Sequence, residues 1–487
     1  MNKLWKKYKE LPIQAKATIC YTICNIMQRG ISIITIPAYT RILTKEQYGT
    51  YSVFLSWIEI FEIIATFRLA WGGFVVGLTK YERERNAYCS SMQCLSITVT
   101  SIFLLLYLAL SPVINACTGM NTMMTLLIFA LLYAMPAIQF WTARRRVEYR
   151  YVSVLCVTAI SSFLMPVLGV IAAWFSEDKA TAVVGARVLV QGSIGLVLIW
   201  VNCHNNFTFY NKEFWKRALI FNLPLLPHYL STVLLHSSDR IIIKQLVGTG
   251  AAGIYSVAYS ASMAMQLFGT SISQSLQPWL FKKLKEKSYD GISNIMNLSL
   301  LLVAVLNLML IILAPEAVSI LAPKSYQEAI WIIPPLAASV VVMFFYQHFV
   351  NVEFFFEESR ITSVASIGAA LLNVGLNYWL IPKFGYLAAG YTTLASYSVF
   401  GAVHYIFMCL VCKKNDCPKT IFDIKIMLLI MAMFAGVTVA VAIGYTHLWL
   451  RLAVLAIILI LLIVKRKVVV GALKQIMKGK RSKSSRL

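Results

Sequence analysis

Long apolar segments separated by short polar ones recur along the whole chain. Fourteen of them are long and apolar enough to cross a bilayer as a helix, which takes about 20 residues. A transmembrane β-barrel is not expected, because its strands alternate polar and apolar residues over about ten positions. The pattern predicts an all-α polytopic membrane protein with about 14 transmembrane helices. The predicted helices span residues 17–40, 50–76, 91–113, 122–142, 151–175, 182–202, 218–242, 253–279, 294–314, 329–352, 361–381, 386–411, 423–445 and 448–465.

Basic residues are distributed unevenly between these predicted spans. If the N-terminus is cytoplasmic, 33 of the 44 Lys and Arg residues fall on the inner side and nine on the outer side, while Arg29 and Arg68 fall within helices. This split follows the positive-inside rule, so we expect both termini in the cytoplasm. The net charge of +24 then reflects topology and contact with anionic lipid headgroups, and we expect no nucleic-acid partner. The first apolar run lacks a small-residue cleavage site, so we expect no cleaved signal peptide.

The chain carries no sequence motif that is typical of an enzyme. It has no Walker A loop and no HExxH motif, and its longest connection, around residues 203–217, has about 15 residues. Cys409, Cys412 and Cys417 lie close together in sequence but have no fourth metal ligand nearby. We therefore expect a protein that is not an enzyme and that has no cofactor and no metal site.

Short sequence fragments recur about 204 residues apart. The segment "YGTYSV" at residues 48–53 returns as "AGIYSV" at residues 252–257, so that Gly49 corresponds to Gly253. Each fragment opens a predicted helix on the outer side of the membrane. Two further matches, at offsets of 203 and 205, join Pro112 to Pro315 and Gly185 to Gly390. The repeat favours two parallel halves of six helices each, although chance similarity between apolar segments remains an alternative.

Two six-helix halves imply a definite domain organisation. Because six is an even number, both halves enter the membrane in the same sense, and a pseudo-two-fold axis along the membrane normal relates them. We expect two pseudo-symmetric bundles around a central cavity, formed by residues 1–203 and 204–411. Two additional C-terminal helices occupy residues 412–467, and a basic cytoplasmic tail follows at residues 468–487.

Charged residues within the predicted spans are the first candidates for function. A charge at the centre of a membrane helix costs roughly 2.5–3.5 kcal/mol and persists where it finds a partner or a wet cavity. Arg29 lies about 18 Å from the inner end of its helix, and Glu59 and Glu62 lie roughly 13 and 18 Å down the next one. We therefore predict that Arg29 pairs with Glu59 or Glu62. Such a pair serves substrate or ion handling, or it is a structural salt bridge; Arg68 lies deeper, and snorkelling to the interface is its alternative.

Polar residues follow one face of several predicted helices. The three-to-four residue spacing predicts a polar stripe on the helix at 17–40 and another on the helix at 253–279. Such a stripe lines water or holds helices together, and the number of amides favours water. The helix at 218–242 adds an acid, an arginine and a histidine, which we take either as an interfacial pair or as groups for ion coupling. The residues concerned are Asn25, Gln28, Arg29, Gln266, Gln274, His228, Asp239 and Arg240.

Three sequence motifs carry a family resemblance. They are "GISIITIPAYTRILTKEQYGTYSVF", "LPHYLSTVLLHSSDRIIIKQLVGTGAAGIYSVAYS" and "IPKFGYLAAGYTT". Together they resemble polysaccharide flippases of the multidrug/oligosaccharidyl-lipid/polysaccharide exporter superfamily. The resemblance implies a bacterial inner-membrane protein that moves undecaprenyl-pyrophosphate-linked oligosaccharides from the inner to the outer leaflet by alternating access. The products are O-antigen (lipopolysaccharide), capsule or exopolysaccharide.

The resemblance also implies roles for particular residues. Arg41 and Arg240 match the family's motif arginines, and Asp239 matches its motif acid. Essential cavity cations in related flippases make Arg29 and Arg68 candidate pyrophosphate contacts. A lipid II flippase and a cation-coupled multidrug antiporter of the same superfamily are the alternatives. The substrate lipid and membrane lipids are the expected partners, with the polysaccharide polymerase and chain-length machinery as further ones, and we expect a monomer.

The segment between the first two predicted helices has the composition of a hinge. Pro37 is expected to interrupt the first helix, Arg41 and Lys45 to meet the outer surface, and Gly49 to begin the return into the membrane. Gly253 is expected to play the part of Gly49 in the second half.

Overall fold

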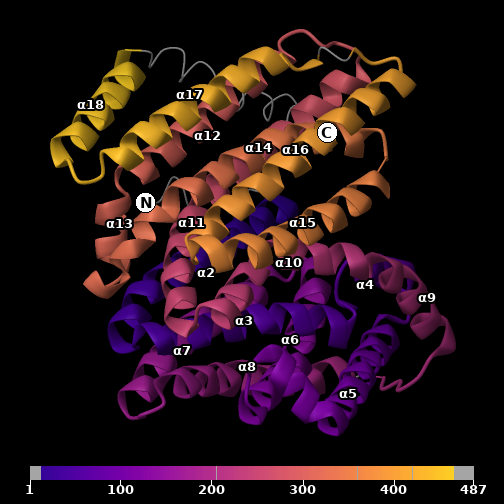
Figure 1. Cartoon of the computed structure of the whole chain (residues 1–487). Coiled ribbons are helices and arrows are strands. Elements are labelled where there is room, and N and C mark those ends of the chain that lie inside the picture. The colour runs from indigo at the N-terminus through magenta and orange to yellow at the C-terminus, as the bar shows by residue number, and fades with distance from the viewer. Residues whose placement is uncertain (1–11, 205, 359, 419–420, 465–487) are drawn as a thin grey trace, which may run out of the picture. The chain divides into compact units, whose positions relative to one another are not determined.

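The structure is a computed structural model that describes residues 12–204, 206–358, 360–418 and 421–464 (Figure 1). The predicted basic tail at 468–487 lies outside the described residues. The described part consists of helices joined by short connections, which confirms the all-α prediction. The helices are α2 (Ile13–Ile42), α3 (Lys45–Thr66), α4 (Gly73–Lys80), α5 (Arg85–Thr118), α6 (Thr122–Val147), α7 (Tyr151–Trp174), α8 (Lys179–His204), α9 (Lys212–Asn222), η1 (Leu223–Leu225), α10 (Leu226–Leu246), α11 (Thr249–Lys285), α12 (Ile292–Ile312), α13 (Ala314–Leu321), η2 (Lys324–Trp331), α14 (Ile333–Phe355), α15 (Arg360–Phe384), α16 (Ala388–Lys414), α17 (Ile424–Ile443) and α18 (Leu448–Val464).

Each predicted span falls on one or more of these helices. Eleven helical segments of the described residues are long and apolar enough to cross a membrane. The three predicted spans outside that set are α3, α11 and α18. Two glutamates lie in the membrane-spanning part of α3, α11 is rich in hydroxyl and amide side chains, and α18 has only 17 residues.

The second predicted span is not one continuous helix. Helix α3 ends at Thr66, and the next two residues, Phe67 and Arg68, have positive φ angles of 50° and 47°. Left-handed backbone is unusual for residues other than glycine and marks a strained, defined turn. Helix α4 then begins at Gly73 and turns Phe74 into an apolar core that α5 and α9 complete. The single helix predicted at 50–76 is therefore wrong, and Arg68 lies in a turn.

The connection between α2 and α3 also differs from its prediction. Helix α2 continues through Pro37 as far as Ile42, so the expected interruption at Pro37 is wrong. The guanidinium of Arg41 donates a hydrogen bond to the carbonyl oxygen of Pro37 at 3.0 Å. The chain leaves the helix at Leu43, where the backbone becomes extended. Thr44 then starts α3 with a capping box, which satisfies two backbone groups at the new helix start.

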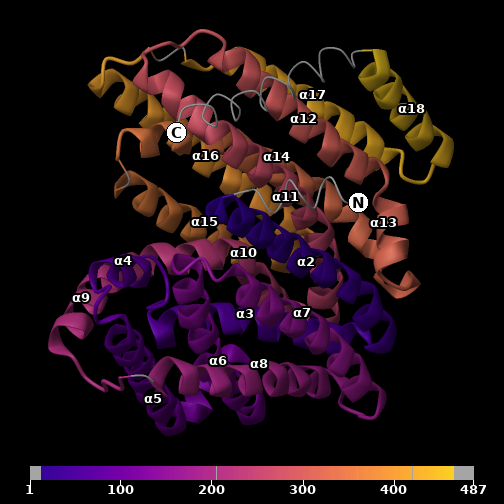
Figure 2. The ribbon, with the colours of Figure 1, turned by 180° about the vertical axis from the view of Figure 1, so that it is seen from behind.

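Backbone contacts divide the chain into two compact units, Met1–Gly253 and Ile254–Leu487. In the first unit α2 packs along α7, α6 packs on α8, and α3 packs on α10 (Figure 2). In the second unit α14 packs on α16, α15 packs on α16, and α12 contacts both α14 and α17. The repeat-based boundaries at 203 and 411 stay predictions.

Within the second unit, a buried arginine joins the last helix to α12 and α13. The guanidinium of Arg451 on α18 forms two hydrogen bonds with the carboxylate of Glu316 on α13, at 2.8 and 3.0 Å. It also donates to the carbonyl oxygen of Ile312, the last residue of α12, at 2.9 Å. Because a paired guanidinium fits a carboxylate with two parallel bonds, this contact fixes the start of α18.

Gly49 and Gly253, which the sequence repeat relates, lie against each other where α3 and α11 begin. A Cβ atom on Gly49 would lie 1.8 Å from the carbonyl oxygen of Thr249, and one on Gly253 would lie 2.5 Å from the carbonyl oxygen of Lys45. Thr249 lies four residues before Gly253, and Lys45 lies four residues before Gly49. The contact is therefore reciprocal, as a two-fold relation between the two helix starts requires. Neither glycine can carry a side chain without moving backbone.

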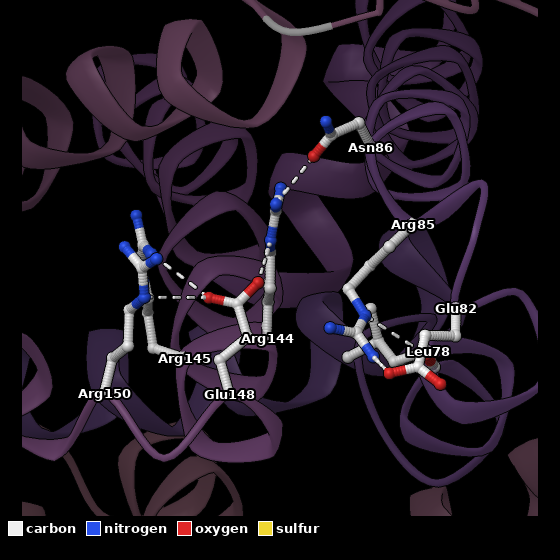
Figure 3. A network of polar contacts seen from close by, with 8 residues as sticks. All are labelled: Leu78, Glu82, Arg85, Asn86, Arg144, Arg145, Glu148 and Arg150. Carbon is white, nitrogen blue, oxygen red and sulfur yellow. Dashed lines mark hydrogen bonds and ion pairs between the residues drawn. The ribbon is translucent and has the colours of Figure 1, made fainter.

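At the end of α6, one carboxylate forms ion pairs with several arginines (Figure 3). Glu148 accepts from Arg144 at 2.8 Å and from Arg145 at 3.1 Å, and the Nε atom of Arg150 lies 3.7 Å away. Arg144 also donates to Asn86 on α5 at 2.6 Å, which ties the two helices together. Burial raises the pKa of Glu148, but the hydrogen bond from Arg144 and the arginine charges together hold it below its usual 4.5.

The first prediction concerns the glycine contact. Gly49→Ala is expected to destabilise the protein by about 2 kcal/mol, because the added methyl group overlaps backbone that cannot yield freely. The measurement is the apparent melting temperature of the purified protein in detergent. Gly185→Ala is the matched control, since a Cβ there meets no atom within 4 Å and alanine favours the helix. Equal melting temperatures for the two variants would contradict the contact.

The second prediction concerns Glu148. Because its folded-state pKa is depressed, its ionised form stabilises the fold at neutral pH, and this stabilisation is lost as the pH falls through that pKa. Glu148→Gln should therefore melt at a lower temperature than the wild type at pH 7. The difference should shrink below pH 4.5. Glu84→Gln, at an exposed position, is the control and should follow the wild type at both pH values. A gap that is independent of pH would argue against this role.

Candidate functional site

A polar seam runs between α3 and α10 in the first unit. The carboxylate of Glu59 accepts a hydrogen bond from the Ser237 hydroxyl at 2.5 Å. The guanidinium of Arg240 donates to the Ser56 hydroxyl at 3.3 Å. Residues 56 and 59 are three apart on α3, and residues 237 and 240 are three apart on α10. This spacing keeps each pair on one helix face. The two hydrogen bonds therefore lie about one helical turn apart along the packed helices.

The two glutamates of α3 lie in different surroundings. Glu59 is exposed apart from its bond to Ser237, whereas Glu62 is buried. The carboxylate of Glu62 accepts a hydrogen bond from the Gln139 amide on α6 at 2.8 Å. A buried carboxylate needs such donors, because an unpaired one is costly in an apolar interior. Glu62 therefore joins α3 to α6, while Glu59 keeps an accessible oxygen.

Arg68 is held by aromatic rings in the turn after α3. Its guanidinium carbon lies 4.5 Å from the ring centre of Trp71 and 5.4 Å from that of Tyr229 on α10. Its backbone N–H donates to the Thr66 hydroxyl at 3.2 Å, which helps to fix the left-handed turn. Among the described residues no carboxylate lies within ion-pair distance of Arg68. The side chain is half-buried, and the rings position a cation without neutralising its charge.

The polar residues of α2 are exposed. Asn25, Gln28 and Arg29 lie on the open side of the helix, and its buried side is formed by residues such as Cys24 and Tyr39. Within the described part of the chain, Arg29 forms no ion pair with Glu59 or Glu62. The physical reason is packing: α2 lies along α7 and contacts α3 little beyond the turn that joins them. The predicted pair is absent from this conformation, and a role for these residues stays a prediction.

Other predicted residues of α10 are fixed within the helix bundle. Asp239 is completely buried next to the half-buried Arg240. His228, in the first turn of α10, is half-buried, and its backbone carbonyl oxygen accepts hydrogen bonds from the hydroxyls of Ser231 and Thr232. Their part in coupling stays a prediction.

The polar face of α11 is partly used to hold helices together. In the second unit Gln266 contacts the sulfur of Met343 on α14 at 3.9 Å, and Gln277 donates to Asn351 on the same helix at 3.3 Å. Gln274 is exposed. Of the two alternatives that the sequence left open, helix contact accounts for Gln266 and Gln277, while Gln274 is free to face water.

The structure also brings together a pair that the sequence analysis missed. The Nδ1 atom of His404 on α16 lies 2.9 Å from both carboxylate oxygens of Glu353 on α14, and both side chains are buried. The Thr362 hydroxyl adds a longer contact of 3.4 Å to the same carboxylate. The acidic run that follows Glu353 concealed it, because the predicted span ended at residue 352. A helical-face plot of 348–355 is the signal that would have placed Glu353 inside the bundle.

These arrangements define what the first unit can bind. Among the described residues, Arg68 has a half-buried guanidinium with no carboxylate within ion-pair distance, in the turn after α3. Guanidinium groups bind phosphate oxygens with paired hydrogen bonds. The turn that carries Arg68 is therefore suited to an anionic group of the phosphate kind.

Solved structures share this fold at low sequence identity. "Lipid II flippase MurJ, inward closed conformation" has a TM-score of 0.64 and 13% identity, and the match covers 93% of this chain and 100% of that one. An inward-facing multidrug resistance MATE family transporter of the MOP superfamily has a TM-score of 0.60 and 13% identity, with coverages of 82% and 99%. A MOP superfamily transporter from Pyrococcus furiosus has a TM-score of 0.51 and 14% identity, with coverages of 81% and 95%.

Comparison at the level of sequence places the chain in a family. No curated protein matches the chain. The family model described as "Polysaccharide biosynthesis protein" matches residues 15–284, which is more than half of the chain. This match shows the family, and the solved structures show the shared fold. The chain belongs to the polysaccharide biosynthesis protein family.

Proposed function

We propose that this protein is a flippase for undecaprenyl-pyrophosphate-linked oligosaccharides and not an enzyme. It moves these lipids from the inner to the outer leaflet of the bacterial cytoplasmic membrane by alternating access, for O-antigen, capsule or exopolysaccharide. Both termini lie in the cytoplasm, because that orientation puts most Lys and Arg residues on the inner side. The polysaccharide polymerase and chain-length machinery are the proposed partners, and the protein acts as a monomer.

The main support for the proposal is that the guanidinium of Arg68 is half-buried and has no carboxylate within ion-pair distance among the described residues. A cation that a membrane protein keeps half-buried without an acidic partner is expensive, so it is retained where it has a task. Two aromatic rings hold the guanidinium in place, and its buried Nε atom has no hydrogen-bond partner among the described residues. A pyrophosphate offers the oxygen acceptors that such a group binds best. We assign Arg68 to the pyrophosphate of the substrate lipid.

The neighbouring polar groups fit the same task. Arg240, which donates a hydrogen bond to the Ser56 hydroxyl on α3 at 3.3 Å, is a second arginine of the first unit. The exposed residues Asn25, Gln28 and Arg29 of α2 are proposed contacts for the sugar or the phosphate, as is the exposed amide of Gln274. Amides and hydroxyls suit a sugar chain, because each can both donate and accept hydrogen bonds. Glu59, Glu62, Asp239 and His228 are the proposed groups for ion coupling.

A lipid II flippase is the second candidate. The match that covers a complete solved flippase at a TM-score of 0.64 supports it. Lipid II is also a pyrophosphate-linked glycolipid, so the same cations would serve. A multidrug antiporter is less well supported, because a cationic drug would meet Arg68 as a like charge.

The deciding experiment uses purified protein in liposomes that contain a fluorescent undecaprenyl-pyrophosphate oligosaccharide. A membrane-impermeant quencher reaches only the outer leaflet. Flipping therefore appears as quenching of the fluorescence that was protected in the inner leaflet. Parallel liposomes carry fluorescent lipid II or a cationic dye. We expect the oligosaccharide lipid to move faster than lipid II and the dye to stay in place. Transport of the dye alone would overturn the proposal, and equal rates for both lipids would favour the second candidate.

The third prediction concerns Arg68 in this assay. Arg68→Ala should slow flipping at least tenfold, because a hydrogen bond to a charged group contributes about 1.5–3 kcal/mol. Arg68→Lys should restore only part of the rate, since lysine keeps the charge but loses the paired geometry. The measurement is the initial flipping rate per reconstituted molecule.

Two controls separate function from folding in this series. Arg83→Gln removes an exposed arginine from the α4–α5 connection and should leave the rate unchanged. The melting temperature of Arg68→Ala should also stay within a few degrees of the wild type. Wild-type flipping by Arg68→Ala would remove this residue from the site.

A further inference from the structure

We propose that a basic hollow between α4 and α9 binds the phosphate headgroup of an anionic phospholipid of the inner leaflet. The hollow has a volume of about 600 Å³ and lies within the first unit. It is open to the surroundings and combines three cations, one carboxylate and two large apolar side chains. We call it the α4–α9 hollow; its lining residues are Lys80, Glu213, Lys216, Arg217, Ile220 and Phe221.

The lining changes from charged to apolar along α9. Lys216 and Arg217 occupy the middle of the helix, and Ile220 and Phe221 follow about 6 Å further on, at 1.5 Å per residue. Both apolar side chains are exposed, at 63% for Ile220 and 44% for Phe221. A phospholipid changes from phosphate to acyl chain in the same order. A free phosphate or a soluble anion would leave the apolar half of the hollow unfilled, so the lining favours a lipid.

The charges of the hollow are only partly neutralised. Glu213 accepts a hydrogen bond from the Tyr81 hydroxyl at 2.6 Å, and its carboxylate lies 3.8 Å from the ammonium group of Lys80. In the described part of the chain no carboxylate lies within ion-pair distance of Lys216 or Arg217. The Arg217 guanidinium instead lies 5.7 Å from the ring centre of Tyr81.

Arginines at the neighbouring end of α6 behave differently. Arg144 and Arg145 share the carboxylate of Glu148 within the network of Figure 3. Arg85, at the start of α5, is bonded to Glu82 and to the carbonyl oxygen of Leu78. These cations already have internal partners. Lys216 and Arg217 therefore leave two positive charges for an external anion.

The hollow is built on a rigid support. Phe214 and Ala218 of α9 are buried in the apolar core that also contains Phe74 and Leu78 of α4. The ring of Phe221 lies so close to Gly73 that a Cβ there would come within 2.7 Å of it. The apolar wall is therefore fixed to the start of α4. In the orientation proposed above, which this inference uses, the cations lie at the inner membrane surface, where a headgroup phosphate lies.

The fourth prediction tests this site by native mass spectrometry of the purified full-length protein titrated with phosphatidylglycerol or phosphatidylcholine. A basic residue near an anionic lipid contributes about 1 kcal/mol, which corresponds to about a fivefold change in affinity. The double variant Lys216→Gln/Arg217→Gln should therefore bind phosphatidylglycerol about 25-fold more weakly, with phosphatidylcholine binding unchanged. The charge-matched control Arg83→Gln/Lys285→Gln, at exposed positions outside the hollow, should change affinity less than twofold.

A variant that is expected to increase lipid affinity distinguishes a specific effect from misfolding. Glu213→Gln removes the carboxylate and frees Lys80, so it should bind phosphatidylglycerol several-fold more tightly, which a damaged protein would not do. Equal affinities for the double variant and its control would overturn the proposal. Displacement of the lipid by millimolar inorganic phosphate would also overturn it, because the site would then recognise an anion alone. Flipping of the oligosaccharide lipid is assayed on the same samples, so failure of lipid binding is distinguishable from failure of the proposed function.

Discussion

The close approach of Gly49 and Gly253 is the constraint on which the first unit depends. Backbone meets backbone there, so the start of α11 and the start of α3 have one allowed distance and register. Helix α10 ends just before α11 begins, and it runs back along α3 from this point. The hydrogen bonds between α3 and α10 follow from that register, because a helix that starts elsewhere would not bring Ser237 to Glu59. A small-residue contact thus restricts how α3 and the α10–α11 segment pack where the seam begins.

Charges within the spans are stabilised in several distinct ways. Arg451 has a carboxylate partner, Glu62 has an amide donor, and Glu353 has an imidazole. Each of these groups is buried, and each contact joins two helices, so their main effect is structural. Arg68 and Glu59 differ, because one is held by aromatic rings and the other keeps an accessible oxygen. Function is therefore to be sought where the structure leaves charge accessible.

Much of the fold could be predicted from the sequence, and the errors have physical causes. The apolar spans and the offset of 204 between Gly49 and Gly253 depend on composition and spacing, which a linear sequence carries. The turn at Phe67 and Arg68 could not be found this way, since apolar residues continue across it and neither residue is a glycine. The rise per residue placed Arg29 and Glu59 at similar depths, but depth does not determine which helices are neighbours. Helix α2 packs on α7, and that tertiary choice is absent from the local pattern.

The break after α3 also links the candidate site to the α4–α9 hollow. Helix α4 begins directly after the turn that carries Arg68 and ends at Lys80, a length of about 12 Å at 1.5 Å per residue. Trp71, in the turn, stacks on the guanidinium, and two residues later Gly73 contacts Phe221 of the hollow. A rigid helix of two turns transmits displacement, because its core residues Phe74 and Leu78 are packed on both sides. The turn that carries Arg68 and the apolar wall of the hollow are therefore joined through one packed helix.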